Sequence, residues 1–194
     1  MAGENEIDLV TRAAAGETEA FRKLFEAHHA AMFRLAYRLT NTVDAAEDIT
    51  QECFLRLIRS PGFDCERGGL RQYLFGIVRN LVRQRRYASG REVPWDDEAE
   101  DDPVAAITAH PAPPGSSETS HVVQAAIAML PPLQREVVVL FELEELTLEE
   151  TAAVVGAEVG AVKSRLYRAR ERLRRSLAPY RSHSGRPSEE GVDV

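Results

Sequence analysis

The chain has 194 residues, 44% hydrophobic residues and a formal net charge of −7, values typical of a soluble globular protein with one ordinary domain or two small ones. No apolar run approaches the roughly 18 residues that span a bilayer, and the first residues lack the basic start and apolar stretch of a signal peptide. The two cysteines, Cys53 and Cys65, are too few for a disulfide framework, so we expect a cytoplasmic protein without membrane insertion.

Helical periodicity predicts three helices in the N-terminal half, after a lead over residues 1–17. The expected helices span 18–40, 44–60 and 70–87. Residues 61–69 interrupt the pattern with one proline and several glycines. We assign these helices to one small domain, residues 18–88.

The second of these helices has two different faces. Its inward face is apolar: Ala46, Ile49, Cys53, Phe54, Leu57 and Ile58. Its outward face combines acids, an amide and one apolar side chain: Asp44, Asp48, Gln51, Glu52 and Leu55. An exposed leucine among acids favours a protein partner with basic residues, and the alternative is an ordinary solvated acidic face.

The third helix lies in a segment, residues 67–91, that holds seven arginines and no acid. Opposite its apolar flank it carries arginines, aromatic rings and amides: Gln72, Tyr73, Arg79, Asn80, Arg83 and Tyr87. Single-stranded nucleic acid is bound by this combination, because bases stack on rings and cations follow the phosphates. The alternative is that the tyrosines complete the edge of the core while the arginines stay solvated.

Residues 89–120 change in composition, with five prolines and seven acids between 91 and 102. We expect an extended, poorly ordered linker there and a loose tail over 181–194. Helical periodicity resumes over 121–180, and the one candidate strand, VVVLF at 137–141, lies inside a helical repeat. The predicted fold class is therefore all-α, with two small helical domains joined by a flexible acidic, proline-rich linker.

The C-terminal domain carries the pattern of a helix-turn-helix. Thr147 and Glu150 form a capping-box signature at a helix start. Ala152, Gly156 and Val162 then supply the small residue, the turn and the apolar packing residue at the required offsets.

The second helix of this motif belongs to residues 160–175, which carry seven Lys or Arg against one Glu. Its apolar stripe is Val162, Leu166, Ala169, Leu173 and Leu177. The opposite side carries Lys163, Ser164, Tyr167 and Arg168, which suits contact with a major groove and with phosphates. A solvated charged face is the alternative.

Together these segments resemble the extracytoplasmic-function sigma factors of bacterial RNA polymerase, over residues 18–88 and 121–180. Residues 44–58 resemble the segment that docks on the clamp helices of the polymerase β′ subunit, residues 63–87 the promoter-melting and minus-ten segment, and residues 130–173 the minus-thirty-five domain. Tyr73 stands where the family often has tryptophan, and Cys65 where it often has proline.

The resemblance implies a protein that binds core RNA polymerase through its β′ and β subunits, directs it to promoter DNA and promotes strand opening, without catalytic residues, metal or cofactor. It implies core docking by Asp48, Gln51, Glu52 and Leu55. It implies contact with the displaced strand by Arg71, Tyr73, Arg79, Asn80 and Arg83, with the loop over 63–69 accepting a flipped base. It implies minus-thirty-five recognition by Lys163, Ser164, Tyr167 and Arg168, and an anti-sigma factor that holds the protein inactive.

Two other functions remain open at this point. One is a conventional helix-turn-helix regulator whose N-terminal half dimerises or senses a ligand. The other is an enzyme or metal sensor built on His28, His29, Cys53 and Cys65, although the sequence has no CxxC, HExxH or glycine-rich phosphate loop. We expect structural roles for these four residues, with an oxidant response of Cys65 as a milder hypothesis.

Overall fold

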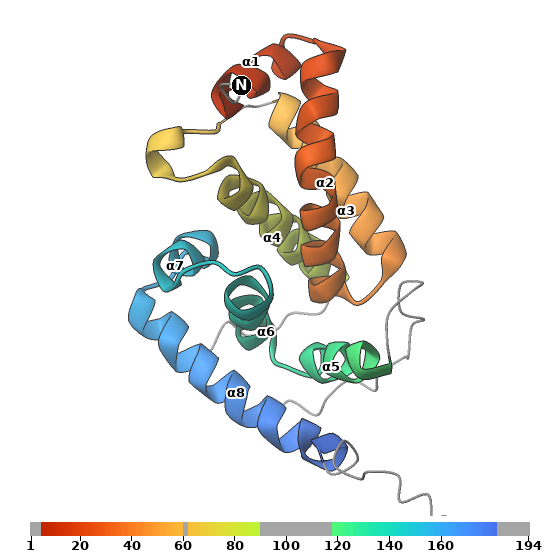
Figure 1. The fold of residues 1–194 in the computed structure, drawn as a ribbon, viewed down its shortest axis with the longest axis vertical. Coiled ribbons are helices and arrows are strands. Elements are labelled where there is room, and N and C mark those ends of the chain that lie inside the picture. Colours follow the sequence, from red (N-terminus) through yellow and green to blue (C-terminus); the bar gives the residue numbers. More distant parts are fainter. Residues whose placement is uncertain (1–4, 60–61, 90–117, 182–194) are drawn as a thin grey trace, which may run out of the picture.

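The computed structural model describes residues 5–59, 62–89 and 118–181, and these form helices joined by short connections (Figure 1). The N-terminal half contains α1 (Glu6–Ala14), α2 (Thr18–Thr40), α3 (Val43–Arg59), the short 3-10 helix η1 (Cys65–Arg67) and α4 (Leu70–Ala88). The C-terminal half contains α5 (Glu118–Ala128), α6 (Pro132–Val138), the π-helical turn η2 (Val139–Leu143), α7 (Leu148–Val155) and α8 (Val159–Arg181).

The predicted all-α class with a C-terminal helix-turn-helix is confirmed. Within the described ranges there is no strand, and no helix there is long and apolar enough to cross a bilayer. The expected linker and tail fall almost wholly on 90–117 and 182–194, which lie outside the described residues.

Helix α1 lies within residues 1–17, where the periodicity of the sequence predicts no helix. The side chain of Asn5 caps it by accepting a hydrogen bond from the Ile7 N–H at 3.2 Å. Val10 and Ala13 are buried, and the helix packs against α2. A helix of nine residues would be only marginally stable in isolation. Helix α1 is therefore stabilised by its packing against α2.

The helix-turn-helix forms as its sequence predicts. Thr147 and Glu150 cap α7 reciprocally: the Thr147 N–H donates to the Glu150 carboxylate at 2.8 Å, and the Glu150 N–H donates to the Thr147 hydroxyl at 3.2 Å. Gly156 ends α7 with a φ of 62°, a left-handed conformation that favours glycine. Ala152 and Val162 are buried between the two helices.

The run over 137–141 is helical, as its place in a helical repeat predicts. Helix α6 continues directly into the π-helical turn η2. Val137, Val138, Val139 and Leu140 are all buried. The run is continuously apolar because α6 and η2 are covered on several sides, by α8, α7 and α2.

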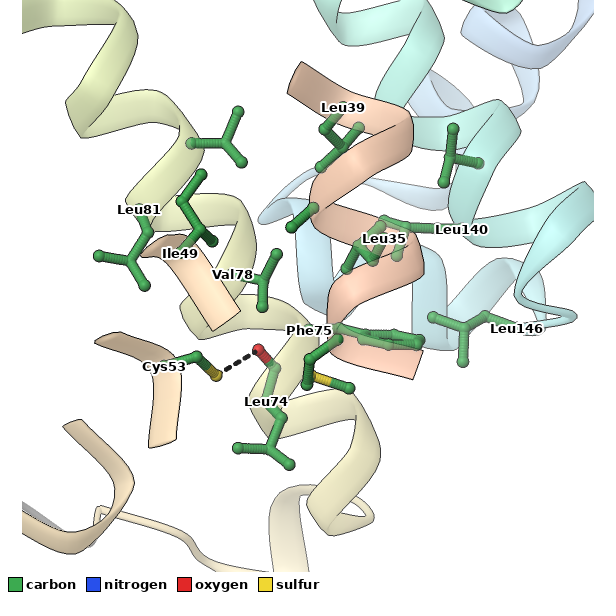
Figure 2. Packing of buried hydrophobic residues seen from close by; sticks show 14 of the residues in the cluster. Leu35, Leu39, Ile49, Cys53, Leu74, Phe75, Val78, Leu81, Leu140 and Leu146 are labelled. Carbon is green, nitrogen blue, oxygen red and sulfur yellow. Dashed lines mark hydrogen bonds between the residues drawn. The ribbon is translucent and has the colours of Figure 1, made fainter. Parts of the chain in front are cut away.

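The two halves pack against each other and share one hydrophobic core. Helix α2 lies against α5, α6 and η2, and α4 lies against α7 (Figure 1). Leu35 of α2 and Phe75 of α4 face Leu140 and Leu146 of the C-terminal half, and all four are buried (Figure 2). The two domains expected from the sequence are therefore in direct contact in this structure.

Candidate polymerase and nucleic-acid interfaces

The outward face of α3 is accessible. Gln51 is exposed, and Asp48 is exposed while its carboxylate accepts a hydrogen bond from Arg85 of α4 at 3.0 Å. Glu52 and Leu55 are half-buried, and Glu52 pairs with Arg56 one turn further along at 3.0 Å. The four residues predicted to dock on polymerase thus share one side of α3, opposite the residues that form the core.

The loop before α4 has a defined conformation. The Asp64 side chain accepts a hydrogen bond from the Glu66 N–H at 3.0 Å and caps η1. Gly68 has a φ of 142°, and a Cβ atom there would lie 2.3 Å from the side-chain oxygen of Gln72. Only glycine fits this position without displacing Gln72, whose side chain also accepts a hydrogen bond from the Gly69 N–H at 3.1 Å.

Tyr73 lies beside this loop. Its ring packs against Phe63 with the ring centres 5.8 Å apart, and it is half-buried. Part of the Tyr73 ring is therefore used in holding the loop, and the rest is accessible.

A cluster of arginines surrounds one buried carboxylate, that of Glu144. Arg38 donates to it at 2.6 Å, and Arg71 donates to it at 2.8 Å and to the Glu144 backbone carbonyl at 3.1 Å. Arg34 lies 3.9 Å away. The Arg71 guanidinium also lies over the Phe75 ring, 4.8 Å from its centre.

A second ion pair between the two halves is fully buried. The Nε of Arg79 donates to the Glu136 carboxylate at 2.7 Å, with 8% and 6% of the two side chains exposed. The helical wheel expects Arg79 on an open face, but Arg79 is buried and pairs there with Glu136 of α6. Farther along α4, Asn80 is exposed and Arg83 is half-buried. The predicted strand-binding residues therefore form a surface that is only partly accessible.

The outward face of α8 is open. Lys163, Ser164 and Arg168 are exposed, and Tyr167 is 69% exposed. Their helix is held from behind by the buried residues Val162, Leu166 and Ala169. Nearby, Arg170 is fixed by Glu142, which accepts its hydrogen bond at 2.8 Å. A helix presented in this way matches a recognition helix that enters a major groove.

Sequence reasoning missed the acids and two of the arginines that link the halves: Arg34, Arg38, Glu136 and Glu144. Glu136 carries a detectable signal, because it precedes five apolar residues and stands within a buried stretch. A charged residue at such a position is rarely buried without a partner. The partner itself cannot be inferred from the local pattern.

The four residues of the metal or redox hypothesis are placed separately. His28 lies 3.5 Å from Glu6, and burial lowers its pKa. His29 packs on the Phe25 ring. Cys53 donates a weak hydrogen bond to the Leu74 carbonyl at 3.7 Å (Figure 2), burial raises its pKa to about 12, and Cys65 is exposed. Among the described residues no three His, Cys, Asp or Glu gather in a way that could hold a metal ion.

Comparison with known families gives two matches in chain order. The family model described as Sigma-70 region 2 matches residues 24–92. The family model described as Sigma-70, region 4 matches residues 120–173. These spans contain α3, α4, α7 and most of α8, and therefore the three faces described above.

Individual proteins similar to this chain are also sigma factors. ECF RNA polymerase sigma factor SigE of Mycolicibacterium smegmatis is 35% identical over 170 residues, 84% of this chain and 63% of that protein. ECF RNA polymerase sigma factor SigM of Mycobacterium tuberculosis is 34% identical over 175 residues, 89% of this chain and 85% of that protein. Sigma factor RpoE of Bartonella quintana, solved in complex with the anti-sigma factor NepR, is similar in structure, with a TM-score of 0.65, 30% identity and coverage of 83% of this chain and 98% of RpoE.

Proposed function

This chain belongs to the extracytoplasmic-function sigma factors, and from that premise we propose that it binds core RNA polymerase, directs it to particular promoters and promotes strand opening. The observation that carries the proposal is the outward face of α8, which presents four exposed side chains: Lys163, Ser164, Tyr167 and Arg168. The helix-turn-helix behind them is fixed by the cap of α7 and by the buried inner side of α8. In this role the protein acts in the cytoplasm with the polymerase and performs no covalent chemistry itself.

Docking on polymerase is assigned to the outward face of α3. Asp48, Gln51 and Glu52 would pair with basic side chains of the β′ clamp helices, while Leu55 would add apolar contact. The accessibility of this face in the free chain supports the assignment. Exposed charges of this kind mainly increase the rate and specificity of association.

Upstream recognition is assigned to α8. Lys163 and Arg168 would contact phosphates and base edges of the minus-thirty-five element in the major groove, with Ser164 and Tyr167 between them. The helix enters the groove as a rigid unit because its opposite face is anchored by buried residues.

Strand opening is assigned to α4 and the loop before it. Arg71, Arg79, Asn80 and Arg83 would hold the displaced strand, and bases would stack on Tyr73, each stack contributing about 1–3 kcal/mol. A flipped base would enter the loop over 63–69, which offsets the few kcal/mol of unstacking. Recognition then requires that Arg71 and Arg79 exchange their present carboxylate partners for phosphates.

Control by an anti-sigma factor completes the proposal. The similar RpoE chain was solved in complex with one, NepR, which supports the same class of partner here. Such a partner would prevent either polymerase docking or promoter contact.

The test is run-off transcription with purified core RNA polymerase, on promoters located by mapping transcripts that rise when the protein is overproduced. We expect a promoter-specific transcript only when the protein is added. Lys163→Ala with Arg168→Ala should weaken binding to the upstream duplex about tenfold and reduce that transcript. If no mapped promoter yields a protein-dependent transcript, the proposal is wrong, and a conventional regulator becomes the better explanation.

A further inference from the structure

Gly76 is a glycine that the described part of the fold does not require. It lies well inside α4, where glycine is less favourable than alanine because its backbone loses more freedom on folding. Its backbone is ordinary helix, since the described glycines with a positive φ are Gly16, Gly68 and Gly156. Beyond the adjoining helix backbone, a Cβ atom added at Gly76 would meet no heavy atom within 4 Å. Neither conformation nor packing therefore explains the missing side chain.

Gly68, eight positions earlier, shows the contrast with a glycine that the fold does require. Its φ is 142°, and a Cβ atom there would lie 2.3 Å from the side-chain oxygen of Gln72. At Gly76 the space that a side chain would occupy is empty instead, and no residue of the C-terminal half reaches into it. This space is therefore available to another molecule.

Gly76 lies in the middle of the outward face of α4. At about 100° per residue, Tyr73 one turn before it and Asn80 one turn after it share its side of the helix, and so does Arg83. Asn80 is exposed, while Tyr73, Gly76 and Arg83 are half-buried. Val78, on the opposite side, is fully buried. A bare stretch of helix backbone thus lies between a ring, an amide and a guanidinium group.

The side chains around Gly76 indicate what would lie against it. A missing side chain lets a ligand approach the helix backbone closely, which is a common use of glycine. A tyrosine ring stacks on a base, an amide hydrogen-bonds to a base edge, and a guanidinium group pairs with a phosphate. A single strand of nucleic acid presents all of these partners, because its bases are unpaired and accessible.

We propose that Gly76 is the point of closest contact between α4 and the displaced promoter strand, where a deoxyribose and its base lie directly against the helix backbone. This rests on the proposed function, which assigns Tyr73, Asn80 and Arg83 to that strand. A base stacks on Tyr73, Arg83 holds a phosphate farther along, and the strand between them passes over Gly76. Any side chain at position 76 holds the strand away from both residues.

Stability and function should then change in opposite directions in Gly76→Ala. The substitution improves helix propensity and its methyl group meets free space, so the Tm of the free chain should rise by about 2 °C. The same methyl group occupies the place of the nucleotide, so the strand should bind more weakly. A glycine with a purely structural role would give a loss of stability together with any loss of function.

The test uses the complex of core RNA polymerase with the full chain. The probe is a fluorescein-labelled single-stranded oligonucleotide with the non-template sequence of a mapped promoter, followed by fluorescence anisotropy. We expect Gly76→Ala to bind it about tenfold more weakly, as for the loss of one stacked base, and Gly76→Leu to bind it more weakly still. Affinity for core polymerase and for the upstream duplex should not change, because α3 and α8 are untouched.

Ala30→Leu is the control for added apolar bulk. Ala30 is exposed on α2, outside the three proposed faces, so this variant should bind the oligonucleotide like the wild type. Wild-type affinity in both Gly76 variants overturns the proposal. A lower Tm in Gly76→Ala also overturns it, because the fold would then need the glycine. Weaker binding of the upstream duplex by Gly76→Ala counts equally against it, since the effect would not be local to α4.

Run-off transcription by the wild-type chain tests the proposed function separately. An active wild-type chain, combined with unchanged oligonucleotide binding by the Gly76 variants, would remove Gly76 from the contact and leave the function standing. If the wild-type chain gives no promoter-specific transcript, the function is wrong and the contact at Gly76 is wrong with it.

Discussion

At the scale of single residues, the buried Arg79 and the half-buried Arg135 show two ways to replace lost hydration. Arg79 meets a carboxylate, that of Glu136. Arg135 instead donates to backbone carbonyls, those of Leu39 and Leu130 at 3.1 Å. Burial, with a contribution from nearby Arg86, lowers the pKa of Arg135 to about 10, so it stays protonated at neutral pH. The carbonyls accept hydrogen bonds from its Nη1 and Nη2 without supplying a countercharge, whereas its buried Nε has no hydrogen-bond partner among the described residues.

The two cysteines should differ sharply in reactivity. The thiolate is the reactive form, and burial raises the pKa of Cys53 to about 12, whereas Cys65 is exposed. We expect one thiol per native chain to react with Ellman's reagent at pH 8, and none in Cys65→Ser until the chain is unfolded. Two rapidly reacting thiols in the wild-type protein would show that Cys53 is accessible. The oxidant response of Cys65 stays a prediction.

At the scale of elements, local sequence signals account for some helices and not for others. The start and end of α7 follow from a capping box and a glycine that lie within ten residues of each other. Helix α1 could not be predicted in the same way, since its stability depends on α2. Similarly, the helical periodicity of α4 places Arg79 opposite the core of its own domain but cannot show that Arg79 pairs with Glu136 of α6.

The cap of α7 can be tested by Thr147→Ala. Losing the hydroxyl removes one of two reciprocal hydrogen bonds, so the free energy of unfolding should fall by about 1 kcal/mol in a urea titration. Thr18→Ala, at an exposed threonine in the first turn of α2, is the control and should change it by less than about 0.5 kcal/mol. Equal effects of the two substitutions would mean that the capping box contributes nothing specific.

The outward face of α3 can be tested by Asp48→Ala with Gln51→Ala. Both residues are exposed, and the exposed Asp48–Arg85 pair contributes at most about 1 kcal/mol to stability, so the fold should persist. We expect about tenfold weaker competition for core polymerase. Glu26→Ala, at an exposed residue of α2, removes a surface charge on another helix and should compete like the wild type. Normal competition by the double variant would move the docking face elsewhere.

At the scale of the whole molecule, the arrangement of the two halves is what the sequence predicts least. The contact depends on pairs far apart in the chain, such as Arg38 with Glu144, which are 106 positions apart. No periodicity or spacing encodes such a pair. The sequence does predict the all-α class, the helix-turn-helix and the faces of α3 and α8, because each depends on neighbours within one or two turns.

The two surfaces that we propose to bind DNA lie in one protein, and this has a thermodynamic consequence. Once one surface is bound on polymerase, the second meets its site at a raised effective concentration, so joint affinity can exceed either alone by about 10²–10⁴. Each half by itself should therefore bind promoter DNA weakly. Selectivity would arise only on the polymerase, which sets the distance between α8 and α4.

The most direct test of this account is equilibrium binding of the purified chain to core RNA polymerase, followed by analytical ultracentrifugation of the labelled protein. The account predicts that one chain co-sediments with each core enzyme and that unlabelled wild-type chain displaces it. A labelled chain that sediments alone at every polymerase concentration tested would contradict the account.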